Sequence, residues 1–187
     1  MPLTTHSTPY GLRDVKLTAY TDTLGTVLAV TSVDLPVSQT LSFSDTESFN
    51  ELRGDDQVYT TKGTGSKVEW ELESGGIPLD AYKIMAGGTI SETGTTPAQK
   101  KTFTKKGADA RPWFRIEGQV ISESGGDLHC VIYRAKATGE LSGEFGDGQF
   151  YIQSASGEAY PMPSGTHIDK IYDFVQNETI TAFVQPT

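Results

Sequence analysis

Three glutamates on one predicted strand, Glu69, Glu71 and Glu73, are the residues whose types and spacing best suit chemistry. The stretch KVEWELES that contains them alternates polar and apolar residues, which predicts a strand over 66–73 with all three glutamates on one face. Neighbouring glutamates would lie about 6.5–7 Å apart, close to the roughly 6.5–9.5 Å that separates paired carboxylates in inverting glycoside hydrolases. The alternative is an acidic face open to solvent or to a lumen.

The rest of the sequence favours the second interpretation. The other predicted strands offer no cluster of Trp and Tyr to hold a sugar ring, and Trp113 is the only tryptophan besides Trp70. The three histidines stand alone, without the H-x-H or H-E-x-x-H spacing of a zinc site. Neither G-x-S-x-G nor a phosphate-binding glycine loop occurs. We therefore expect a protein that is not an enzyme and has no cofactor and no metal.

Three short features have simple structural interpretations. Arg53-Gly54-Asp55 matches an adhesive tripeptide, but it is predicted to be a turn at the tip of a loop. Asp55, Asp56 and Asp147 are oxygen ligands without the spacing of a calcium loop. Cys130, the single cysteine, excludes an internal disulfide and is expected to be a small core residue.

Composition indicates one β-rich domain over 1–187. The chain has 36% hydrophobic residues and 20 glycines, which is typical of many strands and turns. Its net charge of −9 argues against a protein that grips nucleic-acid phosphates. Acidic residues dominate 34–92 and 117–187, whereas 100–115 is basic, and such a block can steer self-assembly or simply be solvated. No apolar run approaches the roughly 18 residues of a membrane span. The first residues lack the features of a secretory leader, so we expect synthesis in a cytoplasm.

The periodicity predicts a mainly β, sandwich- or barrel-like fold with one short helix. Residues 1–10 are expected to be a flexible arm, and 34–64 a long irregular polar loop with one short strand inside it. The helix is predicted at about 78–86, with Pro78 at its start and glycines after its end. Further strands are expected at 12–20, 26–33, 56–62, 112–123, 127–136, 138–145, 149–155, 168–175 and 178–184, with loop at 91–99 and strand or loop at 100–106. The LHCVIY stretch within 127–136 is apolar on nearly both faces, so it should be central in its sheet or covered by another chain.

This layout resembles the major tail (tail tube) proteins of long-tailed, siphovirus-type bacteriophages. The resemblance spans roughly 11–184 and rests on three segments: ELRGDDQVYTTKG at 51–63, the strand–glycine–helix block at 65–88, and DKIYDF…ETITAF at 169–183. It implies a β-sandwich with a single helix, assembled into hexameric rings that stack as a tube. Each subunit of this family adds strands to an inner β-barrel that conducts DNA, and a long early loop, here 34–64, reaches the neighbouring ring.

The resemblance also implies partners and a location. The partners would be the chain itself, the tape measure, tail terminator and distal tail proteins, and DNA that passes without specific binding, with no membrane partner; the location would be the virion tail. We take Glu69, Glu71 and Glu73 as a lumen- or solvent-facing acidic face. Candidate contacts between subunits are Lys100, Lys101, Lys105, Lys106, Arg53, Asp55 and Asp56. The alternatives are a glycan-binding or adhesive module and a carboxylate-dependent glycoside hydrolase.

Overall fold

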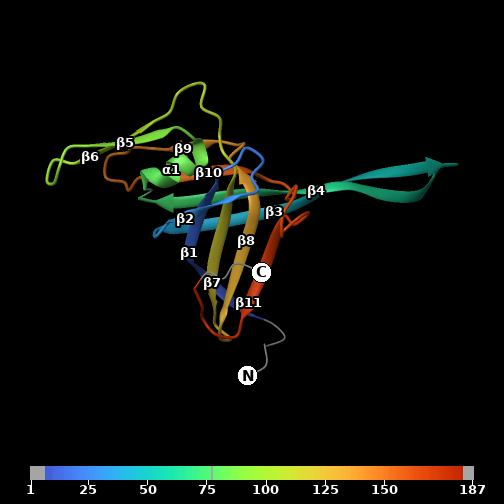
Figure 1. The fold of residues 1–187 in the computed structure, drawn as a ribbon. Helices are drawn as coiled ribbons and strands as arrows, with labels where there is room; N and C mark the ends of the chain where they lie inside the picture. Colours follow the sequence, from blue (N-terminus) through green and yellow to red (C-terminus); the bar gives the residue numbers. More distant parts are fainter. Residues whose placement is uncertain (1–6, 77, 183–187) are drawn as a thin grey trace.

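The computed structural model describes residues 7–76 and 78–182 and confirms a mainly β fold with one short helix (Figure 1). The elements in chain order are β1 (Pro9–Tyr20), β2 (Leu28–Asp34), β3 (Ser38–Gly54), β4 (Gln57–Gly75), α1 (Leu79–Ala86), β5 (Thr89–Thr93), β6 (Lys100–Thr104), β7 (Phe114–Ser122), β8 (Asp127–Lys136), β9 (Leu141–Gly143), β10 (Ile152–Ala159) and β11 (Tyr172–Asn177). Within these ranges, no helix is long and apolar enough to cross a membrane.

Strand β8 connects two layers of an antiparallel, sandwich-like sheet. One edge of β8 pairs with β7 along nearly its whole length. Its other edge pairs first with β11, over 127–132, and then with β10 through Ala135 and Lys136. One layer is therefore β2-β1-β7-β8-β11, and the second, which holds β9, β10, β4 and β3, crosses it (Figure 1). The predicted central position of the LHCVIY strand is confirmed.

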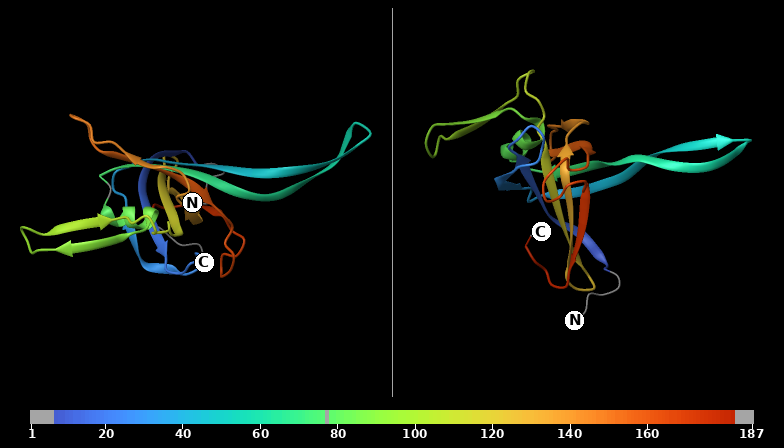
Figure 2. Two further views of the ribbon diagram at one scale, coloured as in Figure 1. Left: turned by 90° about the horizontal axis from the view of Figure 1, so that it is seen from above. Right: turned by 45° about the vertical axis from the view of Figure 1, so that its right-hand side comes forward.

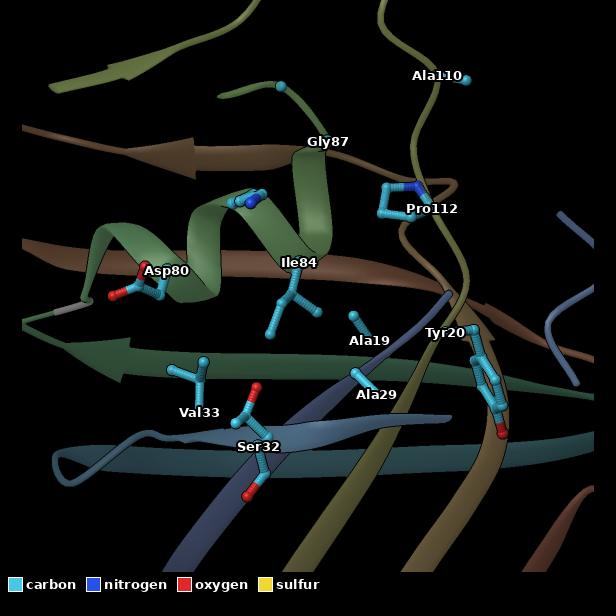
Figure 3. Close-up of a pocket in the computed structure, with 13 residues that line it drawn as sticks. Ala19, Tyr20, Ala29, Ser32, Val33, Asp80, Ile84, Gly87, Ala110 and Pro112 are labelled. Carbon is cyan, nitrogen blue, oxygen red and sulfur yellow. The ribbon is translucent and has the colours of Figure 1, made fainter. Parts of the chain in front are cut away.

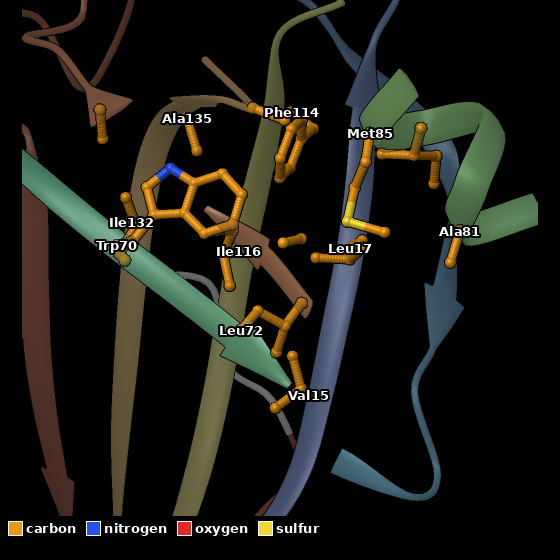
Figure 4. Close-up of a cluster of buried hydrophobic side chains, with 14 of the residues drawn as sticks. Val15, Leu17, Trp70, Leu72, Ala81, Met85, Phe114, Ile116, Ile132 and Ala135 are labelled. Carbon is orange, nitrogen blue, oxygen red and sulfur yellow. The ribbon is translucent and has the colours of Figure 1, made fainter. Parts of the chain in front are cut away.

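The core lies between these layers and under α1 (Figure 4). Trp70 of β4 meets Phe114 of β7 edge to face, with 5.6 Å between ring centroids. The helix adds Ala81 and Met85, both fully buried. Side chains on the apolar face of β4 therefore carry the contact between the layers, because burying a large apolar side chain stabilises a fold by about 1.5–3 kcal/mol.

The boundaries of α1 follow from Pro78 and Gly87. Pro78 is extended at the N-cap, so the helix begins one residue later than predicted. Gly87 ends it with a φ of 73°, which glycine adopts without strain. A β-carbon at Gly87 would lie 2.3 Å from the carbonyl oxygen of Ala110, so this position also needs glycine for close backbone approach.

The prediction of an irregular loop over 34–64 is wrong. Most of this segment forms β3 and the first part of β4, a long antiparallel hairpin closed by the two-residue turn Asp55-Asp56. Both turn residues have positive φ, 48° and 61°, as a hairpin turn matching the strand twist requires. Register shifts near Ser38, Glu47 and Leu52 interrupt the alternation, which explains why no clear period is visible in the sequence.

Several other boundaries also differ from the prediction. Residues 91–99 are only partly loop, because β5 and β6 form a second projecting hairpin. The predicted strands at 138–145 and 149–155 shrink to the short β9 and shift to β10, with a loop over 144–151. Residues 178–182 are not a strand, and the rest of the predicted 178–184 strand lies outside the described residues. Of the predicted arm at 1–10, residues 9–10 belong to β1 and 1–6 lie outside the described part.

Candidate functional site

The acidic face predicted on β4 is present and open. Glu69, Glu71 and Glu73 are exposed, while the residues between them, among them Trp70 and Leu72, are buried in the core. The alternation of a strand lying over a core produces this division. The strand thus holds its three carboxylates on one outer surface.

Neighbouring strands extend this face with small hydroxyls. In register with the three glutamates, β10 places Ser154, Ser156 and Glu158 on one side. On the other side, β3 places Thr40, Ser42 and Ser44. The outer surface of β10, β4 and β3 is therefore a band of serine, threonine and glutamate.

Lys67 is the cation within this band, and two carboxylates neutralise it. Its Nζ lies 2.5 Å from Glu158 Oε1 and 3.2 Å from Glu69 Oε1. The hydrogen bond from Lys67, helped by one from the Tyr160 hydroxyl, holds the pKa of Glu158 below its usual range. The same bond raises the pKa of Lys67. The band is therefore acidic overall and its cation is already engaged.

The tip residues Arg53, Asp55 and Asp56 lie at the far end of the β3–β4 hairpin, away from the acidic band (Figure 2). Arg53 Nη2 lies 2.6 Å from Glu51 Oε2 on its own strand. The tripeptide is part of a hairpin turn, because Gly54 pairs with Gln57 across Asp55-Asp56. The outer arm, which we define as 46–54 with 57–67, makes strand pairs only within itself among the described residues, and Lys67 at its base also contacts Glu158 of β10. It extends roughly 30 Å at about 3.3 Å per residue.

The basic block divides into two engaged and two open lysines. Lys101 Nζ lies 2.6 Å from Asp80 Oδ2 and 3.4 Å from Glu92 Oε1. Lys105 Nζ donates to the carbonyl oxygen of Ala86, at the end of α1. By contrast, the side chains of Lys100 and Lys106 have no ion-pair partner in the described ranges. These four residues lie on or beside the β5–β6 hairpin, which projects in a different direction from the arm (Figures 1 and 2).

Two groups of residues were missed by sequence reasoning. Arg115, Glu117 and Gln119 look like a solvent face of β7 but are buried. Phe145 and Phe150 are almost fully exposed on the β9–β10 loop. Gly146-Asp147-Gly148 between them is a turn signal and predicts a Gly-rich, acidic hairpin tip. The structure places it in the loop over 144–151, and the turn signal does not predict the two exposed rings beside it.

Cavities and metal ligands give no support for a catalytic centre on β4. A cavity of about 590 Å³ lies between α1 and β2, and the three glutamates do not line it. Residues 7–76 and 78–182 contain no group of three His, Cys, Asp or Glu side chains that could hold a metal ion. Burial raises the pKa of Cys130 to about 12, so its thiol stays protonated at neutral pH.

No protein-family model matches the sequence, and no curated protein matches it either.

Proposed function

We propose that this chain is a structural subunit that assembles into the tail tube of a long-tailed bacteriophage. The observation that carries the proposal is the outer arm. A two-stranded hairpin is marginally stable by itself in water, yet this one projects beyond the body (Figure 2). It exposes the large apolar residues Phe49, Leu52, Val58 and Tyr59. Such an arm gains stability when it lies on another subunit, and in the proposed tube it reaches the neighbouring ring.

The open edges of the sheet support self-assembly. Among the described residues, β2 pairs only with β1 and β3 only with β4, so each leaves one edge free. Free edges present unpaired backbone N–H and C=O groups that can pair with another chain. A head-to-tail contact between unlike surfaces closes into a ring when its rotation permits. Hexameric closure is what the family resemblance implies.

The acidic band suits a channel that DNA must cross without sticking. Carboxylates repel phosphate, and the lysine within the band is neutralised by Glu158 and Glu69. Serine and threonine hydroxyls from β3 and β10 lie beside the three glutamates, and the register partners of the glutamates on these strands include no cation. In the proposal this band lines the lumen, and the role is structural and needs no catalytic step.

Electron microscopy of the concentrated protein tests the proposal. Wild type should form tubes or rings. A variant in which Asn-Gly replaces 47–66 joins the paired residues Thr46 and Lys67 by a favourable two-residue turn, so it should fold but not stack. Thr60→Ser with Thr61→Ser is the matched control, since it removes only one methyl group at each position of the same arm, and it should assemble as wild type does. Monodisperse wild-type particles that bind glycans would overturn the proposal.

The two open lysines allow a cleaner electrostatic test than the whole basic block. Lys100→Glu with Lys106→Glu reverses exposed charges without removing an ion pair in the described chain, so circular dichroism should not change. Assembly should be slower and less responsive to salt, because complementary charges act mainly on association rates. Wild-type assembly kinetics would show that the block is only a solvated surface.

A further inference from the structure

The β9–β10 loop presents two phenylalanines to solvent. Phe145 is 91% exposed and Phe150 is 94% exposed, and Asp147 lies between them at the loop tip. Phe145 stacks on Tyr151, with 4.6 Å between ring centroids. The Tyr151 hydroxyl in turn lies 3.1 Å from the hydroxyl of Tyr82 on α1. The base of this aromatic loop is thus held against the helix, while its rings remain uncovered.

A groove with apolar walls, which suits an aromatic side chain, lies between α1 and β2 (Figure 3). Its volume is about 590 Å³, within the roughly 300–1,000 Å³ of pockets that take drug-sized ligands. Small side chains such as Ala19 and Ala29 leave it hollow, and Ile84 and Pro112 make its walls apolar (Figure 3). Lys83 at its rim is exposed and has no ion-pair partner within the described part of the chain.

The loop and the groove lie on opposite flanks of α1. Asp80, Lys83 and Ile84 line the groove and follow the helical spacing of one stripe. Tyr82 is turned about 200° from Asp80 around the helix axis, at 3.6 residues per turn, and contacts Tyr151. The helix therefore separates the exposed rings from the groove of the same subunit. A second copy, placed head to tail, brings one flank against the other, and such a heterologous contact repeats around a ring.

We propose that Phe150, supported by Phe145, occupies the α1–β2 groove of the next subunit in the ring. The occupant is a second copy of this chain because the chain carries both the exposed aromatic loop and the α1–β2 groove, and the two lie on opposite flanks of α1. Charge complementarity also supports this pairing, since the exposed Asp147 of the loop would approach the exposed Lys83 at the groove rim. The inference rests on the proposed ring assembly, for which it names the contact within a ring, as distinct from the contact of the arm between rings.

Photo-crosslinking tests this contact directly. Unlabelled protein with Phe150 replaced by p-benzoylphenylalanine is mixed with ¹⁵N-labelled wild type, concentrated and irradiated. The expected product joins residue 150 of an unlabelled chain to 28–34, 79–88 or 110–112 of a labelled chain. Ala29→Trp in the labelled partner fills the groove, so residue 150 is no longer held at a high local concentration beside it. The crosslinking yield should fall roughly tenfold. Val30→Trp, whose side chain lies outside the groove lining, is the matched control and should leave the yield unchanged.

Microscopy of the same samples separates this inference from the proposed function. Tubes whose crosslinks map elsewhere, or tubes without a crosslink, overturn the contact and leave the tube proposal intact. Groove crosslinks without rings or tubes support the contact and count against the tube. If the samples show no crosslinks and no tubes, both the contact and the tube proposal are overturned. Equal yields with Ala29→Trp and Val30→Trp mean random collision and overturn the contact.

Discussion

Two strands of this molecule carry similar alternating patterns, yet the polar face of one is exposed and that of the other is buried. On β4, Glu69 and Glu71 alternate with core residues and point into solvent. On β7, Arg115 and Glu117 alternate with core residues in the same way, but they are 0% and 4% exposed. An alternating pattern therefore identifies the side of a strand that meets the first core. It does not tell whether a later segment covers the other side.

The cover over β7 comes from the last quarter of the described chain. Arg115 Nη2 lies 2.8 Å from Glu117 Oε1, and its guanidinium lies 5.1 Å from the ring centroid of Tyr133 on β8. His167, from the segment before β11, stacks on that ring at 4.6 Å. Thr181 closes the other end by accepting a hydrogen bond from Gln119 at 2.8 Å. The buried face thus carries a polar network, whereas the face of β4 has none of this cover.

Removing the Glu117 carboxylate should cause the largest loss in the free energy of unfolding. Glu117→Ala leaves the buried Arg115 cation without its carboxylate, and breaking a buried pair in this way costs about 3–5 kcal/mol. Glu71→Ala is the matched control, the same change on an exposed strand face, and it should leave the free energy of unfolding unchanged within error. Urea unfolding of the two variants measures the difference. Equal midpoints would mean that the cover over β7 opens readily to water.

Asp127 anchors the end of the cover and should make it sensitive to acid. Burial alone would raise the pKa of Asp127, but hydrogen bonds from the Thr181 amide, Asn177, Gln119 and His129 outweigh it and lower the pKa below the usual 3.8. A lowered folded-state pKa means that this stabilisation is complete above about pH 4 and is lost as pH falls through the folded value. Hydrogen exchange at the Thr181 amide, corrected for its intrinsic rate, should therefore accelerate below pH 4.

The Asp127→Asn variant isolates this carboxylate from the other acids. Its free energy of unfolding should fall by roughly 1–3 kcal/mol, the cost of weakening a buried hydrogen-bonding group. Hydrogen exchange at the Thr181 amide should then depend less on pH below pH 4. Asp147→Asn, on an exposed loop, is the control and should do neither. Unchanged protection of the Thr181 amide in Asp127→Asn would show that other contacts hold the segment.

Strong local periods explain which parts of the fold could be predicted from the sequence. The 66–73 part of β4, the β7–β8 hairpin and α1 could be predicted because alternation, a glycine turn and a terminal glycine all act within a few residues. The outer arm could not, since bulges near Glu47 and Leu52 break its period. The α1–β2 groove could not either, because Ala29, Ile84 and Pro112 meet only in the folded chain. Local signals fixed the elements, whereas their covering surfaces depend on contacts distant in sequence.

Within the basic block, Lys105 contacts the end of α1, whereas the side chain of its neighbour Lys106 is exposed. Lys105 donates to the final carbonyl of α1, where a cation also interacts favourably with the helix dipole. Lys105→Ala should therefore cost about 0.3–1 kcal/mol, measured by thermal unfolding followed at 222 nm. Lys106→Ala removes a neighbouring exposed cation and should leave the melting temperature unchanged. If both variants melt as wild type does, the contact of Lys105 with the helix end contributes nothing measurable.

The smallest effect on stability is expected on the acidic face itself. Changing Glu69, Glu71 and Glu73 together to Gln keeps the shape of each side chain and removes repulsion between like charges along one strand face. Lys67 keeps its shorter contact with Glu158, so the engaged cation is not released. The denaturation midpoint should stay the same or rise slightly, which contrasts with the loss expected at Glu117. A clear fall in the midpoint would mean that the band is held by contacts among its own carboxylates. Glycan turnover by wild type that disappears in the triple variant would instead assign the three glutamates a catalytic role and defeat the structural one.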